Sequence, residues 1–64
     1  MTKSELNALF TRLDRAVWHI NAGDTTLESV VNEFGLIKTK CGYIHPRWGW
    51  SVEFDEGLGY NLYY

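Results

Sequence analysis

This chain lacks the covalent and metal staples that usually support a domain of its size. It has one cysteine in 64 residues, so no disulfide can form within the chain. Cys41, His19 and His45 are its soft metal ligands, whereas a tetrahedral zinc site needs three or four ligands that lie together. We therefore predict no metal and no cofactor. We also predict no enzyme activity, because no third group is placed to orient Cys41 and His45 as a nucleophile and a base.

Long apolar runs and excess positive charge are lacking as well. No apolar run exceeds three residues, and the first residues carry no basic stretch followed by an apolar one. We therefore expect neither a membrane-spanning segment nor a secretory signal, and the single thiol favours the reducing cytoplasm. The formal net charge of −2 argues against a general duplex-DNA binder, whose affinity comes from lysines and arginines that neutralise phosphates.

Aromatic side chains are what the chain does have. Seven of its ten phenylalanines, tryptophans and tyrosines fall between residues 43 and 64. Each ring buries about 150–250 Å², so a few rings can close the core of a single domain that spans residues 1–64. Rings that the fold leaves exposed would instead form a binding surface.

The first helix is expected over residues 2–22. Apolar side chains recur at spacings of three and four between residues 6 and 20, which gives one apolar stripe. Thr2 and Glu5 have the spacing of a capping box, and Gly23 follows the last turn, where a left-handed residue ends a helix.

A second, shorter helix is expected over residues 25–34. Its apolar residues repeat with the same helical period, and Gly35 follows them. Thr25 and Glu28 again have the spacing of a capping box. Residues 25–36 also resemble the first helix and turn of a helix-turn-helix. The continuation contains Gly42 and Pro46 and alternates in polarity, so no DNA-reading helix is expected.

From residue 37 the apolar period changes from 3.6 to 2, which predicts strands. We expect strands over 37–43, 48–54 and 60–64, joined by short turns into an antiparallel meander. The predicted fold class is therefore α+β, with two N-terminal helices packed on one face of a three-stranded antiparallel sheet (ααβββ).

Alternation assigns the two faces of this predicted sheet. The face toward the helices is expected to carry Ile37, Cys41, Tyr43, Trp48, Trp50, Val52, Phe54, Tyr60 and Leu62. The opposite face is expected to carry Lys38, Lys40, Arg47, Gly49, Ser51, Glu53, Asn61 and Tyr63. A slip of one residue would exchange the two faces.

The function that this pattern favours is binding to another protein. We interpret the chain as a non-enzymatic regulator or inhibitor that occludes its target, a class of short chain common in phage and other mobile elements. The predicted contact residues combine aromatic hot-spot area with an acidic corner: Arg47, Trp48, Glu53, Asp55, Glu56, Tyr63 and Tyr64. A homodimer that pairs the last strand with itself is a further expectation.

Two other interpretations stay open. Lys38, Lys40, Arg47 and Tyr63 would form a basic and aromatic strip for single-stranded nucleic acid if they share the outer face. Alternatively, a carbohydrate or another small ligand would stack on Trp48 or Trp50. The first of these predicts binding that weakens steeply with salt, and the second predicts little dependence on salt.

Overall fold

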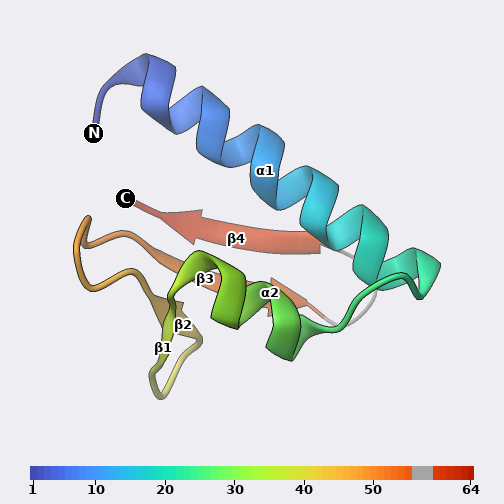
Figure 1. Ribbon diagram of the computed structural model, residues 1–64. Helices are drawn as coiled ribbons and strands as arrows, with labels where there is room; N and C mark the ends of the chain where they lie inside the picture. Colours follow the sequence, from blue (N-terminus) through green and yellow to red (C-terminus); the bar gives the residue numbers. More distant parts are fainter. Residues whose placement is uncertain (56–58) are drawn as a thin grey trace.

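The architecture is α+β, with two N-terminal helices followed by a four-stranded antiparallel sheet (Figure 1). The computed structural model describes residues 1–55 and 59–64. The elements are α1 (Lys3–Ala22), α2 (Leu27–Phe34), β1 (Ile37–Lys38), β2 (Tyr43–Ile44), β3 (Ser51–Asp55) and β4 (Gly59–Tyr63). The strands lie in the order β1-β2-β3-β4, and α1 contacts β4.

The predicted ends of α1 are confirmed. The Thr2 hydroxyl accepts a hydrogen bond from the Glu5 backbone N–H at 3.1 Å, and the Thr2 N–H donates to Glu5 Oε1 at 3.0 Å. Hydrogen bonding of the Glu5 carboxylate, chiefly to the Thr2 backbone N–H and also to the Thr2 side chain, lowers the pKa of the Glu5 carboxyl. At the other end, Gly23 takes a left-handed φ of 82° and donates its N–H to the last turn, as a C-cap glycine does.

The predicted start of α2 is wrong by one residue. The N-cap is Thr26 rather than Thr25, and its side chain accepts a hydrogen bond from the Ser29 N–H at 3.2 Å. Asp24, two residues before Thr26, still caps the last turn of α1, because its N–H donates to the His19 carbonyl at 3.0 Å. Thr26 is therefore the last extended residue before the helix, which is the conformation that an N-cap needs.

The single strand expected over 37–43 is also wrong, and the sheet has four strands instead of three. The chain reverses between β1 and β2, where the Thr39 N–H donates to the Gly42 carbonyl at 2.7 Å. The sequence keeps alternating in polarity through this reversal, so periodicity alone did not reveal the turn. The next strand begins at Ser51 instead of residue 48, because residues 46–48 form another turn.

The extra reversal changes which side chains share a face. Cross-strand pairs place Tyr43, Val52 and Leu62 together, and place Ile44, Ser51 and Tyr63 together on the opposite face. Paired residues in an antiparallel sheet point to the same side, so Ile37 joins the Ile44 row and Lys38 joins the Tyr43 row. The predicted faces of these two β1 residues are therefore exchanged.

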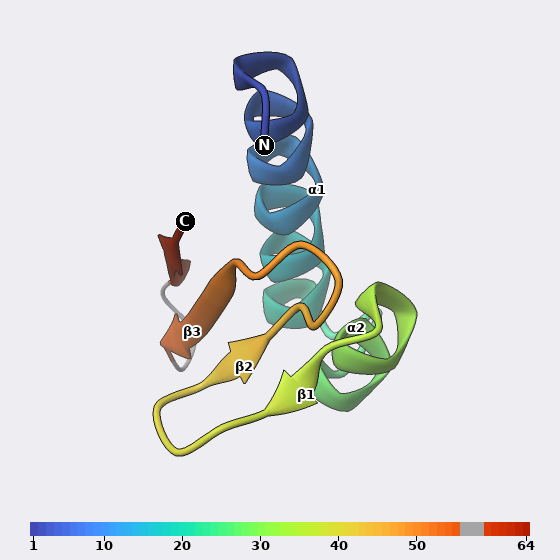
Figure 2. The ribbon, with the colours of Figure 1, turned by 90° about the vertical axis from the view of Figure 1, so that its left-hand side faces the viewer.

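The core lies between the helices and the face that carries Val52. It consists of Leu9, Leu13, Leu36, Trp50 and Val52, with Val31, Phe34, Tyr43, Phe54, Tyr60 and Leu62 packed against it. Both helices contribute to this one cluster, and Figure 2 shows them on the same side of the sheet. The predicted inward positions of Trp50 and Val52 are confirmed. Those of Ile37, Cys41 and Trp48 are wrong, because all three are exposed on turns or at the sheet edge.

Tyr60 links β4 to α1. Its hydroxyl donates to Asp14 Oδ1 at 2.7 Å, and the Phe10 carbonyl oxygen lies 3.3 Å from the same hydroxyl. The Phe10 ring also contacts Tyr64 edge-on, with the two ring centroids 6.3 Å apart. Partial burial, together with the hydrogen bond to Asp14 and the charge of its carboxylate, raises the pKa of Tyr60 well above that of a free tyrosine.

We expect Tyr60→Phe to lower the free energy of unfolding by about 1 kcal/mol near neutral pH, because it removes this hydrogen bond. The wild-type protein should also lose stability above about pH 10, where the unfolded chain releases a phenolic proton that the folded chain retains. Urea unfolding of both proteins between about pH 8 and pH 11 tests this, and the variant should show the shallower decline. Tyr63→Phe, at an exposed position, is the control; a decline equal in both variants contradicts the assignment.

Candidate protein-binding surface

The loop of residues 45–50 exposes one tryptophan and leads into another that is buried. The His45 N–H donates to the Trp50 carbonyl, and the Gly49 N–H donates to the His45 carbonyl, each at 2.8 Å. The Trp48 N–H donates to His45 Nδ1 at 3.2 Å, which places the ring proton of a neutral His45 on Nε2. Trp50 is buried beside the His45 ring, whereas 55% of Trp48 is exposed. The loop therefore presents the Trp48 side chain to solvent.

Exposed apolar side chains gather at one end of the molecule. This end holds both chain termini and the 45–50 loop, as the two ribbon views show (Figures 1 and 2). Among the described residues, six large apolar side chains are exposed, and four of them belong to this end. We call these four the aromatic end: Met1, Trp48, Tyr63 and Tyr64. Exposed apolar area that is concentrated in this way is typical of an interaction surface.

A cavity of about 240 Å³ opens at the aromatic end. It is lined by Met1, Glu5, Ala8, Leu9, Arg12, Phe34, His45, Trp48 and Trp50. The Arg12 guanidinium lies 4.4 Å from the centroid of the Phe34 ring and forms one wall by bridging the two helices. The volume is below the range of about 300–1,000 Å³ that is typical of small-ligand pockets, and an apolar side chain of another protein is the better match.

Arg47 is placed beside this cavity by its contact with Trp48. Its guanidinium carbon lies 5.5 Å from the centroid of the Trp48 ring, within the range of a cation–π contact. Arg47, Glu5 and Arg12 supply charges around an apolar centre, which is the usual arrangement of a protein interface.

The structure divides the predicted contact residues. Arg47, Trp48, Tyr63 and Tyr64 lie at the aromatic end, but Glu53 faces away from the helices beside Asn61, and Asp55 ends β3. Asp55 lies four residue steps after Ser51 along β3, a distance of about 13 Å. Glu56 lies outside the described residues. On the outer face Glu53 lines a small cavity together with Tyr63, so among the described acidic contact residues only Asp55 is separated from the aromatic end.

Tyr63 and Tyr64 also point to opposite sides of the sheet. Tyr64 contacts Phe10 on the side of α1, and 76% of it is exposed. Tyr63 lies on the outer face, where it lines a small cavity of about 60 Å³ with Cys41 and Gly42. The aromatic end is thus a surface that wraps around the end of the sheet.

The basic and aromatic strip expected for single-stranded nucleic acid is not assembled on one face. Register places Lys38 with Tyr43 on the side of the helices, whereas Tyr63 is on the outer face. Lys40 lies in the turn between β1 and β2, and Arg47 contacts Trp48. The predicted shared outer face of these residues is therefore wrong. Stacking of a ligand on Trp50 is also excluded in this conformation, because Trp50 is buried.

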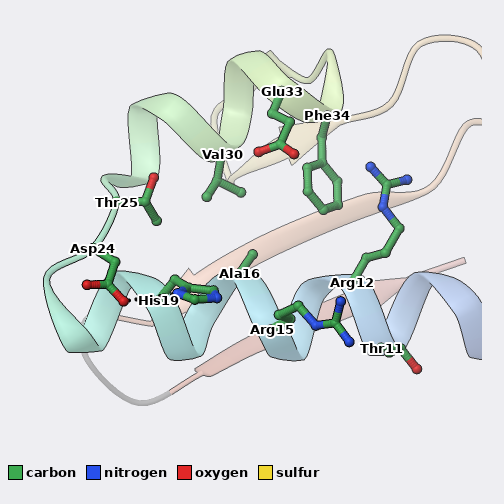
Figure 3. A pocket seen from close by; sticks show the side chains of 10 residues that line it. All are labelled: Thr11, Arg12, Arg15, Ala16, His19, Asp24, Thr25, Val30, Glu33 and Phe34. Atoms are coloured by element: carbon green, nitrogen blue, oxygen red, sulfur yellow. Dashed lines mark hydrogen bonds and ion pairs between the residues drawn. The ribbon is translucent and has the colours of Figure 1, made fainter.

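A second groove, of about 380 Å³, runs between α1 and α2 (Figure 3). Arg12, Arg15 and His19 line it from α1, and Glu33 and Phe34 line it from α2. His19 Nδ1 lies 3.1 Å from Asp24 Oδ2 at one end of the groove. None of the charged side chains in the groove is buried, and both signs are present. The groove is therefore hydrated surface that selects neither an anion nor a cation.

Sequence reasoning missed the residues that make the aromatic end concave. Leu9 and Phe34 come from the two helices and Met1 precedes α1, so these residues meet the 45–50 loop only in the folded chain. The available signal was Pro46 and Gly49, which bracket a turn and should have moved the start of the predicted 48–54 strand past Gly49.

The described residues also contain no cluster of three His, Cys, Asp or Glu side chains that would hold a metal ion. Within residues 1–55 and 59–64, neither helix combines the length and the apolar composition that crossing a membrane requires. No protein-family model, curated protein or solved structure matches this chain, so its function is argued from its own side chains.

Proposed function

We propose that this chain is a non-enzymatic regulator or inhibitor that binds another protein through the aromatic end and occludes part of its surface. The observation that supports this proposal is the concentration of exposed apolar side chains around a cavity of one-side-chain size. Tryptophan and tyrosine are the side chains most enriched among residues that dominate binding energy at interfaces. The 45–50 loop holds Trp48 in place, so little conformational entropy is lost on binding.

The partner surface that fits carries an apolar side chain to fill the cavity. Glu5, Arg12 and Arg47 around the cavity would pair with polar groups at the rim of such an interface. Asp55 is assigned a lesser role, because it lies at the far end of β3 from the aromatic end, whereas Glu53 lines a small cavity with Tyr63. The exposed Cys41 thiol fits a reducing compartment such as the cytoplasm.

We expect Trp48→Ala to weaken binding to the partner by at least about tenfold, because the exposed ring supplies central contact area. The measurement begins with affinity capture from the native host, with and without nuclease, and continues with titration of the captured protein against purified variants. Trp18→Ala is the matched control, since Trp18 is also exposed but lies about 22 Å from the start of α1 along its axis.

Two results would contradict the proposal. One is a partner whose affinity is unchanged in both Trp48→Ala and Tyr64→Ala. The other is capture that is lost after nuclease treatment, which would favour single-stranded nucleic acid as the partner.

A further inference from the structure

The two edges of the sheet differ in how they are protected. β1 has only two residues. Lys38 is one of them, and Lys40 lies in the turn that follows. Short length and lysines are the usual means of preventing an edge strand from pairing with another chain. β4, at the other edge, has five residues and contains no charged residue and no proline. One edge of this sheet is therefore blocked, and the other is not.

The free side of β4 has no partner within the described part of the chain. β4 pairs with β3 on one side, and the backbone hydrogen bonds found outside the regular elements include none from residues 59–63. In Figure 2 no described element lies beyond β4 on its free side. A five-residue strand therefore presents unpaired N–H and C=O groups, which are a template for a further strand.

Helix α1 lies beside this edge without filling the space next to it. A groove of about 460 Å³ runs between α1 and β4. It is lined by Phe10, Asp14, Val17, Gly59, Tyr60, Asn61 and Leu62. Side chains that an added strand would direct toward the helices have room in this groove.

The sequence of β4 is compatible with antiparallel pairing to a second copy of itself. In an antiparallel pair centred on Asn61, Tyr60 of one copy lies opposite Leu62 of the other, and Gly59 lies opposite Tyr63. An aromatic ring then covers a glycine on the outer face, and an aromatic ring packs against leucine on the side of the helices. Asn61 meets Asn61, and no like charges are opposed anywhere along the strand. The favoured occupant of this edge is thus a second copy of the same chain.

We propose that two copies of this chain form a dimer by pairing β4 with β4 in antiparallel register about Asn61, which joins their four-stranded sheets into one sheet of eight strands. The arrangement is a closed two-fold contact that leaves no free β4 edge. It also suits a domain of 64 residues, because a core of this size is marginal and self-association is a common remedy. In this pairing Tyr63 lies opposite Gly59 of the second copy, so partner binding by each copy relies on Met1, Trp48 and Tyr64.

Sedimentation velocity of the full chain, from about 1 μM to about 200 μM, measures the dimer directly. The wild-type protein is expected to sediment as a dimer at the upper concentrations. Asn61→Lys should raise the dissociation constant at least about tenfold, because it places two lysines opposite each other. Asn61→Thr is the matched control, which keeps the position neutral and the dimer intact. Circular dichroism of dilute samples checks that each variant is folded.

A mixing experiment tests the register. Asn61→Lys and Asn61→Glu are each expected to be monomeric alone and to form a heterodimer when mixed, because lysine and glutamate then lie opposite each other. Asn61 also pairs with Glu53 of its own chain, so circular dichroism must first show that Asn61→Glu is folded. Trp48→Ala should dimerise as the wild type does, so failure of the dimer and failure of partner binding are distinguishable. A wild-type chain that stays monomeric at about 200 μM, or an Asn61→Lys variant with unchanged affinity, overturns the proposal.

Discussion

Leu13→Ala is expected to remove about 3 kcal/mol from the free energy of unfolding and to leave the protein close to unfolded at room temperature. Leu13 has 0% exposure and belongs to the core cluster with Leu9, Trp50 and Val52. Its truncation leaves a cavity between the helices and the sheet, which the surrounding backbone can fill only in part. A domain of 64 residues has a total stability of about 3–10 kcal/mol, so this loss is a large fraction of the whole.

The measurement for Leu13→Ala is urea unfolding followed by far-UV circular dichroism. Trp18→Ala on the same helix is the matched control, because it removes a larger side chain that is exposed. We expect this control to change the unfolding free energy by no more than about 0.5 kcal/mol. A loss below about 1 kcal/mol in Leu13→Ala, or a larger loss in the control, would contradict the described core.

The helical half of the fold was predictable because its signals are local. The Thr2 and Glu5 capping box is made by residues within one turn, and Gly23 and Gly35 take left-handed conformations that other residues avoid. The error at the start of α2 has a specific cause. Two threonines are adjacent, and the bonds that finish α1 decide which of them remains extended.

The sheet was predictable only where the chain runs straight. The alternation over β3 and β4 placed Val52 and Leu62 on the same face, and the observed pairing of these residues agrees. Between residues 37 and 43 the same alternation of polar and apolar residues continues through a reversal of chain direction. Two strands with continuous alternation on either side of a turn have the same polarity pattern as one strand, so periodicity did not distinguish the two.

The aromatic end was predictable in part. Trp48 and Tyr64 were expected to be contact residues from their type, and both are exposed. The cavity beside Trp48 was not foreseen, since Leu9 and Phe34 reach it from distant parts of the sequence. The separation of Asp55 from Trp48 was also not predicted. A strand is extended, so residues only a few positions apart in the sequence lie at its two ends.

Gly42→Ala is expected to destabilise the protein by about 2–3 kcal/mol, at the upper end of the cost of overpacking. A Cβ atom at Gly42 would lie 2.5 Å from the Val52 carbonyl oxygen and 3.2 Å from the Glu53 Cα. Both are backbone atoms of β3, so no side chain can rotate to make room. The φ of Gly42 is 157°, a backbone conformation that L side chains rarely adopt, so conformational strain adds to the cost of the close contact. The expected consequence is loss of pairing between β2 and β3 next to the core residue Val52.

Gly49→Ala separates the cost of close contact from the cost of backbone strain. Gly49 has a left-handed φ of 79°, and nothing lies within 4 Å of a Cβ built there, so only conformational strain of about 1 kcal/mol is expected. A D-alanine at position 49, introduced by chemical synthesis, removes that strain and should be at least as stable as the wild type. Thermal unfolding of the three proteins ranks them, with Gly42→Ala lowest. If Gly42→Ala melts no lower than Gly49→Ala, the close approach of Gly42 to Val52 is absent, and the junction between the β1–β2 turn and β3 differs from the one described.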